Sequence, residues 1–245
     1  MNVLEVQGLT KHYPAFTLNG VSFAVSEGAV MGFIGRNGAG KSTTLKSILG
    51  MVHPDAGEVK VFGMDYAANE RAIRRELGVV LGGIDFYPKK KIRVITDVTR
   101  RFYDNWDEDK YRHYLRLFSI DEEKRVDQLS SGMKVKYMIA IALSHNARLL
   151  ILDEPTSGLD PVSRDELTEL LRRLVADGTR SVLFSTHITS DLEKCATHIA
   201  FIKDGELQYT GSLNDFRTHY KDVGATLEDI IVHVERRPLD ESAII

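Results

Sequence analysis

The stretch Gly35-Arg36-Asn37-Gly38-Ala39-Gly40-Lys41-Ser42-Thr43 decides the fold, because it joins two regular elements through a glycine-rich loop. A short apolar run, residues 29–34, precedes the loop and predicts a buried strand. The residues after the loop carry apolar side chains at helical spacing as far as Val52, with Pro54 beyond them. A strand, a glycine loop and a helix in this order predict an α/β layer architecture.

The loop has the composition of a phosphate-binding site. It matches the pattern G-x-x-x-x-G-K-[ST] in full. Gly38 and Gly40 permit positive φ, so that successive backbone N–H groups can point at phosphates. Lys41 supplies a mobile positive charge for the β- and γ-phosphates, and Ser42 offers an oxygen to Mg²⁺. The positive end of the following helix adds to this attraction, and the sequence therefore predicts Mg·ATP binding here.

A second motif places two carboxylates at the end of a strand. The apolar run 149–152 leads directly into Asp153 and Glu154. A carboxylate at the mouth of a buried strand is costly unless a cation or hydrogen bonds compensate it, and Mg²⁺ held through water would compensate Asp153. Glu154 would then face the γ-phosphate and polarise the attacking water. The alternative, an acidic pair capping a helix, is disfavoured by Pro155.

These two elements resemble the Walker A and Walker B motifs of P-loop ATPases. Further segments are similar to the nucleotide-binding subunits of ATP-binding-cassette (ABC) transporters. Residues 129–133, Leu-Ser-Ser-Gly-Met, resemble that family's signature, 157–160 its D-loop, and 185–187 its switch histidine. Tyr13 falls where the family places an aromatic ring against adenine. The order and spacing of the motifs hold from about Val3 to Gly211.

The resemblance implies a set of functional residues. It implies catalytic roles for Lys41, Glu154 and His187, and Mg²⁺ ligation by Ser42 and Asp153. It also implies nucleotide contacts from the adenine platform, the phosphate loop, the signature and the D-loop, namely Tyr13, Gly35, Arg36, Asn37, Gly38, Ala39, Gly40, Lys41, Ser42, Thr43, Ser130, Ser131, Gly132 and Asp160. The signature residues would close over a γ-phosphate bound by the opposite protomer, which predicts a nucleotide-sandwiched dimer with a second ABC ATPase subunit.

Each of these residues taken alone also has a plain structural interpretation. Tyr13 could be a packing residue, and His187 could cap a helix. Ser130 at a helix start has the character of an ordinary N-cap. Asp160 can cap the helix that follows it, with Pro161 in its first turn, and still contact a partner across a dimer.

Two departures from the family pattern stand out. The signature has Ser131 where glycine is usual and Met133 where glutamine is usual. The glutamine that normally follows the strand at 77–81 and touches Mg²⁺ is replaced by Gly82, which is followed by Gly83. Asp85 could substitute for this glutamine, although a solvated turn residue is the favoured interpretation. We hypothesise that hydrolysis is slow until a partner orders this loop.

The predicted fold class is α/β. It comprises a P-loop NTPase core, an antiparallel β subdomain and an inserted α-helical subdomain. We expect an ABC ATPase domain over residues 1–212, with the helical insertion at about 84–140. Residues 213–245 are expected to form a short C-terminal extension with one helix, starting at Thr226.

Composition narrows the classes of function. A formal net charge of −3 argues against a nucleic-acid partner. The basic run 89–93 is interpreted as a solvated loop in preference to an anion or lipid-headgroup site. The single cysteine, Cys195, sits among apolar residues and is expected in the core, consistent with a reducing compartment. No apolar run approaches the roughly 18 residues of a membrane span, so a membrane role would require a partner.

The sequence thus predicts an ATP-binding, ATP-hydrolysing subunit of a membrane transporter. An integral membrane permease is the expected second partner, which would hold the chain in the cytoplasm against the inner face of the membrane. Export is favoured because residues 226–231 resemble a C-terminal helix of the export-type branch. The alternatives are a soluble ABC-type ATPase and an ATP-binding regulatory subunit without transport.

Overall fold

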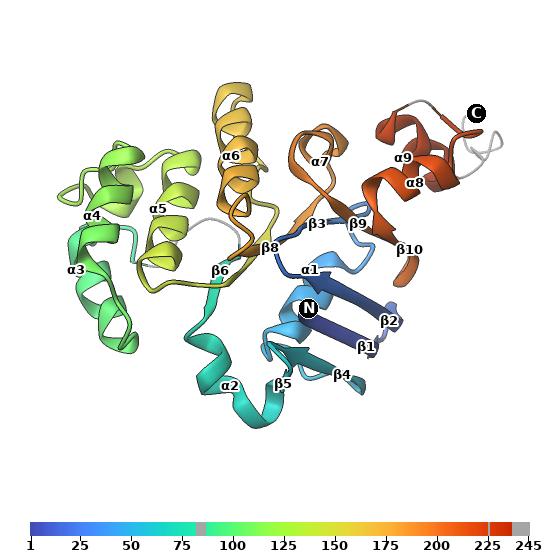
Figure 1. Cartoon of the computed structure of the whole chain (residues 1–245), viewed down its shortest axis with the longest axis horizontal. Coiled ribbons are helices and arrows are strands. Elements are labelled where there is room, and N and C mark those ends of the chain that lie inside the picture. Colours follow the sequence, from blue (N-terminus) through green and yellow to red (C-terminus); the bar gives the residue numbers. More distant parts are fainter. Residues whose placement is uncertain (82–86, 225, 237–245) are drawn as a thin grey trace.

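The structure, a computed structural model, describes residues 1–81, 87–224 and 226–236. Two sheets meet beside the phosphate loop (Figure 1). The smaller, antiparallel sheet has the order β2-β1-β4-β5. Its strands are β1 (Asn2–Tyr13), β2 (Phe16–Ser26), β4 (Ala56–Val61) and β5 (Met64–Asp65).

The larger sheet contains the strand before the phosphate loop and has the order β10-β9-β3-β8-β7-β6, with mostly parallel pairing. Among the residues that the structure describes, only β9 and β10 pair antiparallel within it. Its strands are β3 (Val30–Ile34), β6 (Leu77–Leu81), β7 (Leu149–Asp153), β8 (Ser181–Thr186), β9 (His198–Lys203) and β10 (Glu206–Ser212). This sheet confirms the predicted α/β class, since parallel strands joined through helices are its defining unit.

Helices accompany the larger sheet, and three of them form a separate layer at one side. Figure 1 shows α3, α4 and α5 together at the left, beyond β6. Here lie α3 (Ile92–Thr99), the 3₁₀ turn η1 (Arg100–Phe102), α4 (Glu108–Leu117), the 3₁₀ turn η2 (Val126–Gln128) and α5 (Ser131–Ser144). The remaining helices are α1 (Lys41–Ile48), α2 (Tyr66–Arg74), α6 (Pro161–Leu174), α7 (Thr189–Cys195), α8 (Leu213–His219) and α9 (Leu227–Glu235).

The helical side has a core of its own. The predicted apolar spacing on α4 places Tyr111 and Leu115 in the interior, where they pack with Tyr137 of α5. The hydroxyl of Thr96 lies 2.8 Å from those of both Tyr111 and Tyr137, which satisfies these buried polar groups. Burial raises the pKa of Tyr111 to about 12, so this network stays protonated.

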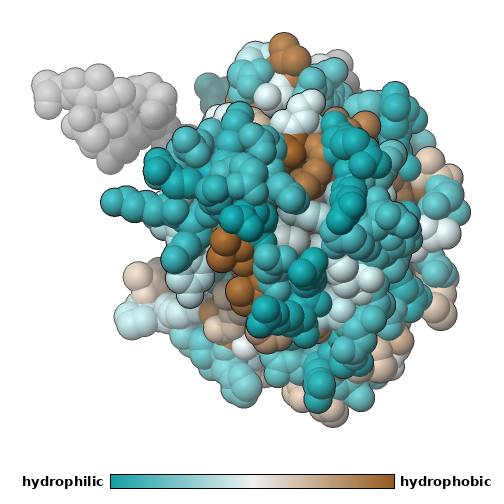
Figure 2. All heavy atoms as spheres, turned by 90° about the vertical axis from the view of Figure 1, so that its left-hand side faces the viewer, coloured by the Kyte–Doolittle hydropathy of each residue, from teal (hydrophilic) through white to brown (hydrophobic). Residues whose placement is uncertain are grey.

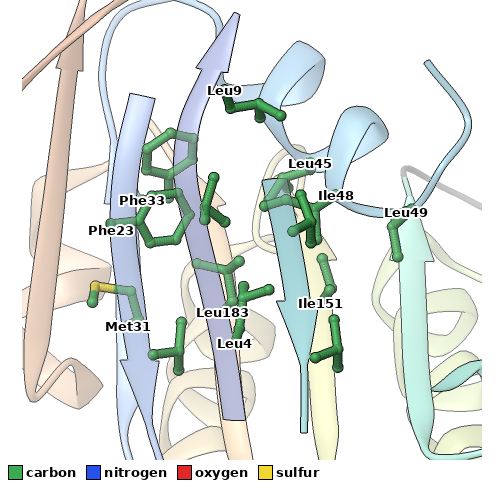
Figure 3. Close-up of a cluster of buried hydrophobic side chains, with 14 of the residues drawn as sticks. Leu4, Leu9, Phe23, Met31, Phe33, Leu45, Ile48, Leu49, Ile151 and Leu183 are labelled. Atoms are coloured by element: carbon green, nitrogen blue, oxygen red, sulfur yellow. The ribbon is translucent and has the colours of Figure 1, made fainter. Parts of the chain in front are cut away.

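The main core fills the space between the two sheets. Figure 3 shows the Phe23 ring of β2 beside the Phe33 ring of β3. Their centroids are 5.4 Å apart in a stacked arrangement. Fully or almost fully buried side chains from both sheets and from the region of α1 complete the cluster, including Leu4, Leu9, Met31, Leu45, Ile48, Leu49, Ile151 and Leu183. The strand before the phosphate loop is thereby fixed from both sides.

The C-terminal region differs from the prediction of one helix. The predicted helix after Thr226 is present as α9, and Thr226 caps it. A second helix, α8, precedes it, capped by the Ser212 hydroxyl, which accepts a hydrogen bond from Asp215 N–H. Its seven residues bury only Leu213 and Phe216, a pattern too short to register as periodicity in sequence. The prediction of a single helix was therefore wrong, whereas the domain boundaries stay a prediction.

Cys195 is buried, as expected, with 5% of its surface exposed. Its thiol donates a hydrogen bond to the Asp191 carbonyl, and burial raises its pKa to about 12. In the part of the chain that the structure describes, no helix combines the length and apolar character needed to span a membrane.

Replacing Phe33 by alanine should lower the free energy of unfolding by about 3–5 kcal/mol, because it removes a fully buried ring between the two sheets. Phe102→Ala is the matched control, since Phe102 is 73% exposed and its loss should change stability by less than about 0.5 kcal/mol. Chemical denaturation of both variants measures the difference, and equal midpoints would contradict this account of the core.

Candidate active site at the phosphate loop

The loop geometry follows from its glycines. Gly38 and Gly40 have φ of 85° and 114°, which L-residues with a side chain rarely adopt. A Cβ on Gly40 would also lie 3.0 Å from the Phe16 ring. Gly40 is the N-cap of α1, so the helix begins at Lys41 with its free N–H groups directed at the loop. The loop and the helix end together form the predicted anion cradle.

Lys41 is held inside this cradle. Its side chain is 5% exposed, and its Nζ donates to the carbonyls of Gly35 at 2.7 Å and Arg36 at 3.2 Å. The same ammonium lies 3.2 Å from Glu154 Oε1. A buried ammonium requires such partners, because an isolated buried charge is strongly disfavoured.

The two carboxylates of the second motif are fixed by the neighbouring strand. In the parallel register, Asp153 at the end of β7 lies opposite Ser185 of β8. The Ser185 hydroxyl donates to Asp153 Oδ1 at 2.5 Å and accepts the Glu154 N–H at 3.0 Å. Glu154 itself has φ of 49°, a left-handed conformation that costs about 1–3 kcal/mol in a non-glycine residue. One buried serine therefore positions both acids.

His187 completes this cluster from the end of β8. Its Nδ1 lies 2.8 Å from Glu154 Oε2, so one carboxylate contacts Lys41 through one oxygen and His187 through the other. The structure thus brings together the three residues predicted to be catalytic. The Glu154 carboxylate lies between the two nitrogen groups and is oriented by both.

Two adjoining cavities open over these groups. A cavity of about 480 Å³ is lined by Ala15, Phe16, Asn37, Gly38, Gly40, Lys41, Ser42, Thr43 and Glu154. A second, of about 340 Å³, is lined by Ile34, Gly35, Arg36, Asn37, His187 and Ile231. All of the predicted phosphate-loop residues except Ala39 therefore line one of the two cavities, and Asn37 lines both.

The predicted adenine platform is not in this lining. Tyr13 is 41% exposed at the end of β1, whereas Phe16 and Ala15 line the larger cavity. Tyr13 and Phe16 pair across the turn between β1 and β2, so both rings sit at the same hairpin. Phe16 was not predicted from the sequence. The two-residue turn after Tyr13 could have indicated it, because such a turn places Phe16 beside Tyr13.

The signature and D-loop lie apart from the cavities in this chain. Ser130 N-caps α5, its hydroxyl accepting the Met133 N–H, while exposed Ser131 follows it. Asp160 caps α6 as predicted, and the hydrogen bond from the Ser163 side chain holds its pKa below the usual range. Gly132 packs against Ser163, so the two segments form one surface. None of these residues lines the cavity around Lys41.

The loop that departs from the family pattern begins beyond β6. Leu81, the last residue of β6, pairs with Asp153, so the strand ends next to the acidic pair. Gly82, Gly83 and Asp85 lie outside the described residues, and the hypothesis about them stays a prediction.

Comparison with known proteins agrees with this geometry. The profile of the ABC transporter family matches residues 18–157, more than half of the chain. The chain belongs to the ABC transporter family. It is the ATP-binding and ATP-hydrolysing subunit of such a transporter. The core described above is accordingly an ABC ATPase cassette.

Individual relatives span most of the chain. A bacitracin transport ATP-binding protein of Bacillus licheniformis is 32% identical over 208 residues, 84% of this chain and 68% of that protein. A Nod factor export ATP-binding protein of Burkholderia orbicola is 33% identical over 82% of this chain and 68% of its own length. A solved ATP-binding subunit of an ABC transporter superposes with a TM-score of 0.84 at 29% identity, covering 96% of this chain and 100% of that chain.

Replacing Ser185 by alanine should lower the rate of phosphate release roughly 10–100-fold, because neither Asp153 nor Glu154 is then fixed by the hydroxyl. Ser181→Ala is the matched control. Ser181 is equally buried on β8, and its hydroxyl accepts the Gly28 N–H far from the acidic pair. Both variants should lose about 1–3 kcal/mol of stability. Equal losses of turnover at fixed folded fraction would contradict a positioning role for Ser185.

Proposed function

We propose that this chain powers an exporter as one half of an ATP-sandwiched dimer, with Lys41, Glu154 and His187 as its catalytic residues. The observation that carries the proposal is the shared carboxylate, which contacts the loop lysine through one oxygen and the histidine through the other. Glu154 also adopts a left-handed conformation, which is uncommon for non-glycine residues and is often found at active sites.

ATP binding changes the partners of Lys41 in this mechanism. In the structure, the Lys41 ammonium lies 3.2 Å from Glu154 Oε1. When ATP binds, the γ-phosphate oxygens replace this carboxylate oxygen as the partner of the ammonium. The carboxylate is then free to accept a proton from the attacking water. His187 remains in contact with Glu154 Oε2, so the carboxylate keeps its orientation when Lys41 binds the phosphate instead. The backbone N–H groups of the loop stabilise the charge on the transferred phosphoryl group.

Mg²⁺ fits the residues at the edge of this site. Ser42 lines the cavity at the start of α1, and Asp153 presents a carboxylate at the end of β7. A hydroxyl and a carboxylate are oxygen ligands of the kind that Mg²⁺ prefers, together with waters and phosphate oxygens. When bound, the ion would neutralise negative charge on the phosphates.

The separation of the signature from the cavity supports the proposed dimer. Ser130, Ser131 and Asp160 are exposed and do not line the Lys41 cavity of their own chain. Val162, beside them on α6, is 67% exposed. A second copy or a close paralogue, placed head to tail, would bring this surface over the opposite phosphate loop. Tyr13 would contribute to the base site at the rim, next to Phe16.

Export and a permease partner are supported by the relatives and by one groove. Both named relatives are transport or export ATP-binding proteins. A groove of about 400 Å³ separates the sheet from the helical side, lined largely by apolar residues that include Met51, Val79, Ile95, Met138 and Ile141. Met51 is 59% exposed at its mouth. We propose that the permease docks here, which would place this chain on the cytoplasmic face of the membrane.

Glu154→Gln should abolish most phosphate release, by roughly 10²–10⁴-fold, while ATP binding persists, because the amide keeps its shape but cannot take up the proton. Glu58→Gln, an exposed change on β4, is the control and should hydrolyse ATP normally. Phosphate release and binding of a fluorescent ATP analogue measure the two properties. Undiminished hydrolysis by Glu154→Gln would overturn the assignment of Glu154 as the base.

The permease proposal has a separate test, in which the protein is purified from membranes and should retain a membrane protein. Failure to retain any membrane protein would overturn that proposal.

A further inference from the structure

A second hollow adjoins the docking groove and is lined by arginines. The arginine hollow is defined here by Arg71, Arg74, Arg75 and Arg101, which surround a cavity of about 570 Å³. The first three come from α2 and its C-terminal end, and Arg101 comes from η1 on the helical side. Two separate parts of the fold therefore bring guanidinium groups to one place.

The charges of this hollow are only partly balanced. Arg74 pairs with Glu70 at 2.7 Å, and Arg75 pairs with Asp104 at 2.6 Å. These two carboxylates are the acidic residues in the lining. Within the described residues, no ion pair joins the exposed side chains of Arg71 and Arg101 to a carboxylate. The lining carries four guanidinium groups against two carboxylates, an excess of positive charge that a carboxylate ligand would neutralise.

The arginine hollow and the apolar groove form a continuous surface. Arg74 and Tyr103 line both. Phe102, 73% exposed, stands in the lining beside Arg101, and Val98 one turn earlier is 53% exposed. Figure 2 looks onto the side of the molecule that carries α3, α4 and α5, where hydrophilic residues cover most of the surface and hydrophobic atoms gather in small patches. The surface is thus apolar along one stretch and cationic at the adjoining stretch.

We propose that the arginine hollow binds the acidic end of an amphipathic helical segment of the membrane subunit. The inference rests on the permease docking proposed above and adds the chemistry of the partner, a segment with an apolar face that ends in carboxylates. The apolar face fills the groove between the sheet and the helical side. The carboxylates reach Arg71 and Arg101, whose planar guanidinium groups can hold them bidentately.

The shape of the site favours a polypeptide over a lipid surface. The groove and the hollow are concave and lie between separate elements, α2 on one side and η1 on the other. A helix can enter such a depression, whereas a planar bilayer contacts protruding surfaces. Cationic side chains at the end of an apolar groove also specify the direction in which a segment lies, because the opposite orientation would place carboxylates against apolar side chains.

Synthetic peptides test this chemistry directly. The probe is a helical peptide with one leucine face that ends in two glutamates, and its control ends in two glutamines. The intact protein should bind the glutamate peptide roughly tenfold more tightly or better, and the preference should decrease as salt is added. The double substitution Arg71→Glu and Arg101→Glu should abolish the preference, and Arg71→Lys with Arg101→Lys should restore part of it. Arg116→Glu, at an exposed arginine of α4, should leave it intact.

Several results would overturn the proposal. If the two peptides bind equally, or if the double glutamate variant keeps the preference for the glutamate peptide, the arginine hollow does not recognise an acidic segment. Vesicles containing phosphatidylglycerol provide the lipid arm. Loss of vesicle binding in the double variant, with peptide binding unaltered, would assign the arginines to lipid headgroups instead.

The permease itself separates this inference from the proposed function. The double glutamate variant should hydrolyse ATP by itself at the wild-type rate, because the arginine hollow is lined by none of the active-site residues. It should retain at least tenfold less membrane subunit on purification. If the wild-type protein retains no membrane subunit, the permease proposal fails. If both proteins retain equal amounts, only the inference about the arginines fails.

Discussion

The parallel pairing of β7 with β8 is the constraint on which the active site depends. It sets Asp153 opposite Ser185 and ends both strands at one edge of the sheet. A shift of one residue would turn every side chain of the strand to the opposite face. Phe184 and Leu152, buried on these strands, make such a shift costly because they fill the core. The register that the core enforces therefore also delivers the acidic pair and His187 to the phosphate loop.

At this edge of the sheet, the contacts of the Lys41 ammonium are of a kind that a bound phosphate can replace. The Lys41 ammonium is buried and satisfied by two carbonyls and one carboxylate. In the proposed mechanism the contact between Lys41 and Glu154 is given up when phosphates bind, so part of the binding energy is used to rearrange the site. Because this carboxylate belongs to Glu154, phosphate binding in that mechanism also frees the proposed base. The left-handed backbone of Glu154 is held by a hydrogen bond from its N–H to the Ser185 hydroxyl.

Much of this organisation could be predicted from sequence because it rests on local rules. The glycines at 38 and 40, the apolar run before Asp153, and Asp160 before Pro161 each specify a backbone conformation within a few residues. Phe16 and the arginine hollow could not be predicted, because they depend on which distant segments meet. Arg101 reaches α2 only through the packing of the helical side, and no spacing rule encodes that contact. The short helix α8 was missed for the opposite reason, since its two buried residues give too little periodicity.

The surface formed by the signature and D-loop differs in character from the surface formed by the groove and the arginine hollow. The signature and D-loop segments have their helix caps satisfied within the chain, and their residues do not line the cavity around Lys41. The groove and the arginine hollow have the reverse character, since they leave apolar side chains and guanidinium groups uncovered. Exposed apolar patches and unbalanced charge on a protein surface are typical of places where a partner binds. Val79 of β6 lines the groove, and Leu81 at the end of the same strand pairs with Asp153, so the groove and the acidic pair lie on neighbouring strands of one sheet.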